Sequence, residues 1–192
     1  KTAYEIHERL VGSEMCIRDR FKRITLYGLE NQVDIEHYII SSGLTDMIKG
    51  CSFYKEINKI YACEYIYKNN RGYWPKLSVN YSNKVQYLYR IHKGAFEVSD
   101  QDGVNQKKYF GDYIHVPFEN MVFFGDGETD VPTFNVLNKN NGKSICVYEN
   151  ENIKSIDIAN KLFSDGRVHH VVKNDYRENS EIDKLIKNII KA

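Results

Sequence analysis

The chain has few cysteines and no long apolar run, and these absences exclude several classes of protein. Its four cysteines stand at positions 16, 51, 63 and 146 of 192 residues. They form no Cys-x-x-Cys pair and have no histidine partner at zinc spacing, which predicts reduced thiols and no zinc site. No stretch is long and apolar enough to cross a bilayer, and no signal-peptide pattern is present. We therefore expect a cytoplasmic protein without a membrane partner.

The sequence also lacks a charge imbalance. Lysine and arginine together number 27 against 26 acidic residues, so the formal net charge is +1. No basic stripe is visible, and we expect no nucleic-acid partner. Repeats and low-complexity tracts are absent as well. The 42% of hydrophobic residues, which include 15 tyrosines and nine phenylalanines, is enough for the core of one domain.

Strand-like and helix-like segments alternate along the chain. Strands are expected at residues 37–43, 60–67, 74–79, 121–124, 144–148 and 168–172. Apolar residues at helical spacing predict helices that start near Lys84 and Pro132, and two more over residues 153–162 and 182–190. The adjacent His169 and His170 are interpreted as a strand end, because neighbouring strand residues face opposite ways. This order is typical of an α/β fold with a parallel sheet.

One pair of strands reads as a hairpin. Residues 60–67 and 74–79 flank the polar segment 68–72, whose Asn-Asn-Arg-Gly sequence suits positive φ angles. The hairpin could form a small flap at the mouth of a site. An edge hairpin of the sheet is favoured, because Pro75 is tolerated at an edge.

The most informative segment is residues 121–132, Met-Val-Phe-Phe-Gly-Asp-Gly-Glu-Thr-Asp-Val-Pro. An apolar run, read as a buried parallel strand, ends in Gly-Asp-Gly, so Asp126 stands where open α/β sheets bind ligands. Asp130 follows near a helix start, and two carboxylates facing one spot suit Mg²⁺. Asp-Gly is also a strong hairpin-turn signal. The helical pattern after Pro132 argues against that alternative.

Two upstream segments carry further candidate residues. Ser41, Ser42 and Gly43 end the apolar strand at 37–43, and a serine there can also cap the next helix. Lys84 follows the Ser82-Asn83 capping pair and starts a helix, where a cation is electrostatically unfavourable. An exposed lysine is the ordinary alternative.

The segment at 121–132 resembles the fourth motif of the haloacid dehalogenase-like (HAD) hydrolases, in particular the phosphoserine-phosphatase-like branch. Ser41 and Lys84 stand where that family has its second and third motifs, in the same order. The resemblance implies a Rossmann-like core in which Asp126 binds Mg²⁺, and Asp130 binds it through water or orients its ligands. It implies that Ser41, with Ser42 and Gly43 beside it, binds phosphate, and that Lys84 offsets the negative charge.

The family's first motif, an apolar strand ending in Asp-x-Asp with the nucleophile, is missing before Ser41. Asp100-Gln-Asp-Gly103 comes after Lys84 and is read as ordinary turn acids. We therefore expect a core that lacks the nucleophile strand and most of the cap domain, whose last helix survives near residues 21–29. The chain by itself is expected to be inactive.

Residues 10–20, Leu-Val-Gly-Ser-Glu-Met-Cys-Ile-Arg-Asp-Arg, resemble an adapter-derived translation at the end of a reading frame. We interpret residues 1–20 as non-native and residues 21–192 as a partial HAD-like core. A weakly amphipathic helix is the alternative for this segment.

The resemblance implies that the intact parent is a Mg²⁺-dependent phosphatase with an aspartyl-phosphate intermediate. Its substrate would be a small phosphorylated metabolite. The alternative is a non-catalytic relative that keeps the pocket to bind phosphate or metal. No residue identifies the substrate or the oligomeric state.

Overall fold

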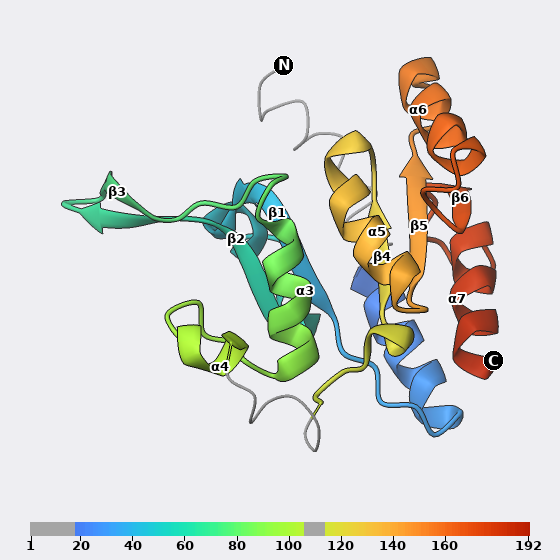
Figure 1. Cartoon of the computed structure of the whole chain (residues 1–192), viewed down its shortest axis with the longest axis horizontal. Coiled ribbons are helices and arrows are strands. Elements are labelled where there is room, and N and C mark those ends of the chain that lie inside the picture. Colours follow the sequence, from blue (N-terminus) through green and yellow to red (C-terminus); the bar gives the residue numbers. More distant parts are fainter. Residues whose placement is uncertain (1–17, 106–113) are drawn as a thin grey trace. The chain divides into compact units, whose positions relative to one another are not determined.

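The computed structural model describes residues 18–105 and 114–192 (Figure 1). These residues form two compact units. The terminal unit contains the described residues up to Ser78 together with Asp175–Ala192, and the central unit is Val79–Asn174. The expectation of one core domain over residues 21–192 stays a prediction.

The terminal unit holds a mixed sheet and several helices. Besides a helix at residues 18–30, its elements are β1 (Tyr38–Leu44), α2 (Thr45–Lys49), η1 (Tyr54–Glu56), β2 (Lys59–Lys68), β3 (Arg71–Leu77) and α7 (Glu181–Lys191). The sheet has the order β1-β2-β3, with β1 parallel to β2 and β3 antiparallel to it. Strand β1 is therefore an end strand of its sheet.

Strand β1 is regular only in its first half. Its pairing with β2 runs evenly from Tyr38 to Ile40, then breaks and resumes at Leu44. Residues 41–43 lie inside this break. The strand expected at 37–43 is thus confirmed, and the serines follow its last regular pair.

The predicted hairpin is confirmed as β2 and β3. Asn69 and Asn70 form its turn with φ angles of 52° and 60°. Such angles suit asparagine better than most residues, because its short polar side chain can hydrogen-bond locally. Pro75 lies in β3, which is the other end strand of the sheet, so the edge interpretation holds.

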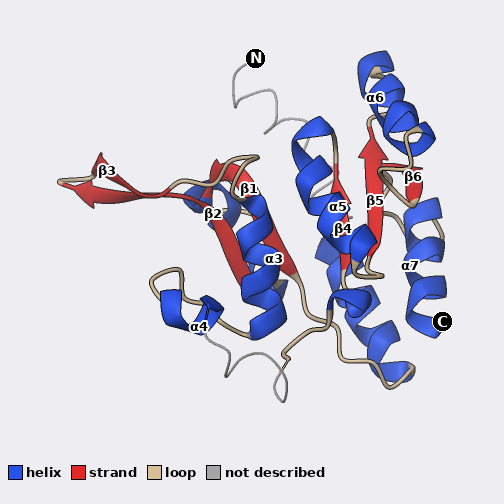
Figure 2. Cartoon of the chain, viewed as in Figure 1, coloured by secondary structure: helices blue, strands red, loops and turns tan. Residues whose placement is uncertain are grey.

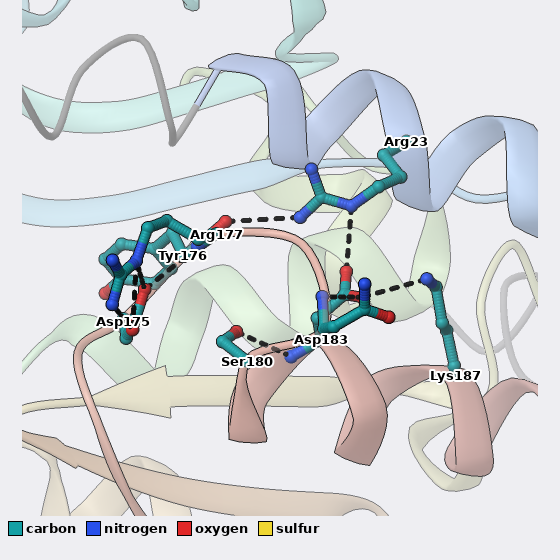
Figure 3. Close-up of polar contacts among 8 residues, drawn as sticks. Arg23, Asp175, Tyr176, Arg177, Ser180, Asp183 and Lys187 are labelled. Atoms are coloured by element: carbon teal, nitrogen blue, oxygen red, sulfur yellow. Dashed lines mark hydrogen bonds and ion pairs between the residues drawn. The ribbon is translucent and has the colours of Figure 1, made fainter.

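A buried carboxylate ties the first helix of the terminal unit to its last (Figure 3). Asp183 of α7 is 1% exposed and accepts from Arg23 Nε at 2.9 Å and from Lys187 Nζ at 2.8 Å. Arg23 also donates to the carbonyl oxygen of Tyr176 at 3.2 Å. The helix expected near residues 21–29 is confirmed, while its origin in a cap domain stays a prediction. Of the segment interpreted as non-native, residues 1–17 lie outside the described part and residues 18–20 begin this helix.

The central unit is an α/β layer structure (Figure 2). Its elements are α3 (Lys84–Lys93), α4 (Gln101–Asn105), η3 (Phe118–Asn120), β4 (Val122–Gly125), η4 (Glu128–Asp130), α5 (Val131–Lys139), β5 (Lys143–Tyr148), α6 (Ile153–Ser164) and β6 (His170–Lys173). The sheet has the order β4-β5-β6, and both pairs are parallel. The expected α/β class with a parallel sheet is confirmed here.

One core cluster joins the helices to this sheet. It consists of the buried residues Phe134, Cys146, Ala159, Leu162 and Val168. Helix α5 packs on β4 and β5, and α6 packs on β5 and β6. Strand β4, which was expected to be buried, is only half-buried before Gly125, because a strand pairs with it on one side alone.

The Asp-x-Asp segment at 100–103 has a structural role. Residues 95–99 form no strand, and the Asp100 carboxylate accepts from the Gly103 amide at 2.7 Å as α4 begins. The interpretation as turn acids is confirmed. Across the described ranges, no helix has both the length and the apolar composition of a membrane span.

Candidate functional site

Lys84 and Asp130 form a buried ion pair in the central unit. Lys84 is the first residue of α3, and its Nζ donates to Asp130 Oδ1 at 2.6 Å. The side chains are 11% and 4% exposed. This contact accounts for a lysine at a helix N-terminus, because the nearby carboxylate offsets the unfavourable helix dipole. The alternative of an ordinary exposed lysine is wrong.

Asp130 also holds the loop that follows β4. Its second oxygen, Oδ2, accepts from the backbone amide of Asp126 at 3.1 Å. Asp130 stands at the N-cap position of α5 but makes no side-chain cap bond. Both of its oxygens are therefore used, one by Lys84 and one by the loop. The expected helix start at Pro132 is confirmed, since α5 has proline in its first turn.

Asp126 differs from Asp130 in being exposed. No hydrogen bond or ion pair reaches its carboxylate from the described residues, so its oxygens are open to a ligand. It directly follows the C-terminal end of β4, as the sequence predicted. The hairpin alternative for this Asp-Gly is wrong, because η4 and α5 follow the turn and β5 lies parallel to β4.

The two glycines beside Asp126 have different roles. A Cβ on Gly125 would lie 2.6 Å from both Asp130 Oδ2 and Phe134 Cζ, so only glycine lets these side chains pack against β4. A Cβ on Gly127 would meet nothing within 4 Å. Gly127 has an extended backbone with φ of 178° that other residues also adopt. Only Gly125 is therefore required by packing.

Cys146 pairs with Gly125 across β4 and β5 and is fully buried. Burial raises the pKa of the Cys146 thiol to about 11, and the negative charges of Asp126 and Asp130 act in the same direction. The thiol is therefore protonated at neutral pH and unreactive.

The serines predicted to bind phosphate lie in the terminal unit. Ser41 Oγ accepts from the Gly43 amide at 3.0 Å, and Ser42 and Gly43 are exposed. The N-cap of α2 is Leu44, without a side-chain cap bond, so the helix-cap alternative is wrong. That Ser41 meets Lys84 and Asp126 stays a prediction.

Within residues 18–105 and 114–192, no cluster of three or more His, Cys, Asp or Glu side chains could hold a metal ion. His169 Nδ1 lies 3.1 Å from Ser144 Oγ. His170 begins β6 and His169 directly precedes it, which agrees with the interpretation as a strand end. Of Asp126 and Asp130, only Asp126 has a carboxylate without a hydrogen-bond or ion-pair partner among the described residues. Mg²⁺ takes one or two protein carboxylates and fills its remaining positions with water and phosphate oxygens. The residues present therefore fit one side of a Mg²⁺ site, with Asp126 as a direct ligand.

The sequence did not predict that the Asp130 carboxylate would accept a hydrogen bond from the loop after β4. Its link to the Asp126 amide joins residues four apart and depends on the η4 turn, for which the pattern carries no signal. It also missed Thr133 of α5, which is fully buried and whose Oγ1 has no hydrogen-bond partner among the described residues.

Comparison with known proteins adds one relative. No family model matches the sequence, and no solved structure matches it. The chain is 30% identical over 173 residues, or 80% of its own length, to an uncharacterized protein of Borreliella burgdorferi. The chain spans 57% of the length of that protein.

Proposed function

We propose that the chain is part of a Mg²⁺-dependent phosphohydrolase of the HAD type, close to the phosphoserine-phosphatase-like branch. The observation that carries this proposal is the Lys84–Asp130 ion pair beside the free carboxylate of Asp126, at the C-terminal end of a parallel strand. A lysine and an aspartate that are 46 residues apart in the sequence share one buried contact there, next to the exposed Asp126. This is the arrangement that a phosphate and a divalent cation would need.

Each residue has a separate task in the proposed site. Asp126 binds the cation, and Asp130 holds the Asp126 loop in place through the backbone amide. Lys84 has three N–H donors and uses one on Asp130, so the others remain for a phosphoryl oxygen. Mg²⁺, when bound, screens the repulsion between the phosphate and an attacking carboxylate. The Ser41 hydroxyl and Ser42 amide, with Gly43 beside them, would bind phosphate oxygens.

The proposed reaction needs an aspartate that this chain does not contain. A carboxylate oxygen of that aspartate attacks phosphorus, and the bond from phosphorus to the substrate oxygen breaks. A second carboxylic acid protonates the leaving oxygen, and water then hydrolyses the aspartyl-phosphate. We propose that the nucleophile strand pairs with the open edge of β4, which is an end strand of its sheet. The substrate would be a small phosphorylated metabolite.

The test uses a protein that carries this chain together with an Asp-x-Asp strand. Asp126→Asn should remove most of the Mg²⁺-dependent hydrolysis of an aryl phosphate. Asp130→Asn should lower turnover by about 10- to 100-fold and weaken Mg²⁺ binding less, as expected of a residue that acts through another. Glu128→Gln is the matched control, because Glu128 is exposed on the same loop. Unchanged turnover of the Asp126 variant at limiting Mg²⁺ would refute the ligand role.

The same assay separates the non-catalytic alternative. If that protein binds inorganic phosphate with Mg²⁺ but hydrolyses no aryl phosphate, the pocket serves binding alone. Loss of phosphate binding in a Lys84→Met variant that circular dichroism shows to be folded would then still identify the pocket.

A further inference from the structure

The outer half of the β2–β3 hairpin, residues 64–77, exposes an unusual set of side chains. We call it the arm. Strand β1 pairs with β2 only as far as Cys63, so among the described residues no other strand lies beside the arm, which extends past β1 (Figure 1). Its large apolar side chains are between 43% and 67% exposed, and they are Tyr65, Ile66, Tyr67, Tyr73 and Trp74. Four of these five are aromatic.

The arm also carries an uncompensated positive charge at its tip. Lys76 pairs with Glu64, the one acid of the arm, at 3.0 Å. Lys68 and Arg71 lie directly opposite each other beside the turn, and like charges in such positions destabilise a hairpin. In the part of the chain that the structure describes, neither forms an ion pair. An anion bound between them would remove this repulsion.

At the tip, the two cations lie between aromatic residues in the sequence. An open hollow of about 560 Å³ is lined by Lys68, Asn69, Arg71, Gly72 and Tyr73. The Lys68 Nζ lies 5.4 Å from the centroid of the Tyr73 ring, and Trp74 stands opposite Ile66 in the next position. Tyr67, next to the tip, donates a 2.5 Å hydrogen bond to Asp46 of α2.

We propose that the arm binds single-stranded nucleic acid. Proteins that bind single strands combine cations for the phosphates with aromatic rings on which bases stack. Lys68 and Arg71 would hold phosphates, and Tyr73 and Trp74 would carry bases. This revises the expectation from net charge, because the balance of +1 over the whole chain hides a basic tip.

The composition of the arm favours this partner over two others. A membrane-binding hairpin would need more aliphatic surface, and the arm has one exposed aliphatic residue, Ile66. Its outermost residues, Asn69 and Asn70, are polar amides that are costly to bury in hydrocarbon. A second copy of the arm would bring like charges together. The proposal does not depend on the phosphatase function.

The only tryptophan of the chain makes the test specific, because Trp74 lies on the arm. An oligothymidylate of about twelve nucleotides, long enough for one site, is titrated into the full chain at low salt. We expect saturable quenching of the Trp74 fluorescence. Two phosphate contacts predict that log K falls with log salt with a slope of about −1.4.

Substitutions locate the binding. The double variant Lys68→Gln with Arg71→Gln should bind about tenfold more weakly and lose most of the salt dependence. Tyr73→Leu keeps the charge and should also weaken binding. Lys154→Gln removes an equivalent exposed charge from α6 and should bind like the parent chain. Circular dichroism checks that each variant is folded.

Three results would overturn the proposal. One is a folded chain whose Trp74 fluorescence does not respond to the oligonucleotide at low salt. Another is binding that the tip variants leave unchanged, which places the site elsewhere. The third is a blue shift of Trp74 with vesicles of anionic phospholipid but no response to the oligonucleotide, which assigns the arm to a membrane surface.

Discussion

At the scale of single residues, the sharpest prediction concerns the two glycines beside Asp126. Gly125→Ala places a Cβ 2.6 Å from Asp130 Oδ2 and Phe134 Cζ, so these side chains must shift. We expect a loss of about 1–3 kcal/mol in the free energy of unfolding. Gly127→Ala meets nothing within 4 Å and should change stability by less than about 0.5 kcal/mol. Urea denaturation of both variants measures the difference, and equal effects would contradict the packing role.

The Lys84–Asp130 pair predicts a strong coupling between two positions. Lys84→Met leaves the buried Asp130 carboxylate without its cation, which costs about 3–5 kcal/mol in typical buried pairs. Replacing both residues with apolar ones should cost less than the sum of the single changes. A double-mutant cycle on unfolding free energies measures this coupling. Strict additivity would mean that the 2.6 Å contact does not exist in solution.

At the scale of elements, one stabilising and one destabilising substitution test the conformation of the β2–β3 turn. Asn69 and Asn70 both have positive φ. Asn70→Gly should stabilise the hairpin slightly, because glycine adopts this region without strain. Asn70→Val should destabilise it by about 1–2 kcal/mol, because a β-branched residue clashes there. Amide exchange along β2 and β3 reports both changes, and a valine variant with unchanged protection would exclude a left-handed turn.

The sequence correctly predicted those helices and strands that are marked by residues within their own segment. The starts of α3 at Lys84 and of α5 beside Pro132 follow from apolar spacing and from the proline in the first turn. The hairpin followed from its turn residues. Arg23 and Asp183 carry no such cue, since 160 residues separate the two sides of their contact. The break in β1 after Ile40 also depends on a partner strand that the pattern does not specify.

The sequence predicted only part of the candidate site. The resemblance to a known family named Lys84, Asp126 and Asp130, and the structure brings Lys84 against Asp130. The use of Gly125 was not predictable, because its need for a small side chain comes from Phe134 packing behind it. Contacts of this kind are set by tertiary packing and leave no periodic signal.

At the scale of the whole molecule, acid should weaken the terminal unit through His37. Its Nε2 lies 2.9 Å from Thr25 Oγ1, and its ring contacts the Phe21 ring with centroids 4.7 Å apart. Burial, and then the charge of Arg20, lowers the pKa of His37 to about 4. The unfolded chain, with an ordinary histidine pKa near 6.5, binds the proton first, so this contribution to stability falls as pH drops from about 6.5 to 4.

Denaturation at several pH values between these limits tests the effect. His37→Gln removes the titrating group and should flatten the decline. An Asp183 effect would appear only at lower pH. Burial raises the pKa of Asp183, but hydrogen bonds from Lys187, the Asn179 amide and Arg23 outweigh it and leave the pKa below its ordinary value. A decline of equal size in the His37 variant would assign the acid sensitivity to other groups.

The end strands of the two sheets predict self-association of the isolated chain. Strands β1 and β4 each have one edge without a partner strand in the described ranges. Exposed strand edges offer backbone donors and acceptors to another chain. Sedimentation should show assemblies that grow with concentration and dissolve on dilution. A protein that also carries the nucleophile strand should stay dispersed at the same concentrations, and equal association of both would rule out the strand edges as its cause.

The described cysteines differ in how easily an alkylating reagent can reach them. Cys51 and Cys63 belong to the terminal unit and are partly exposed, while Cys146 is buried in the central unit. The raised pKa of Cys146 slows its alkylation further, so its labelling requires the central unit to open. Timed alkylation followed by peptide mass spectrometry would therefore give the opening rate of the central unit from Cys146, with the partly exposed pair as a reference for direct labelling in the same sample. Cys146 is thus a built-in chemical probe for the opening of the central unit.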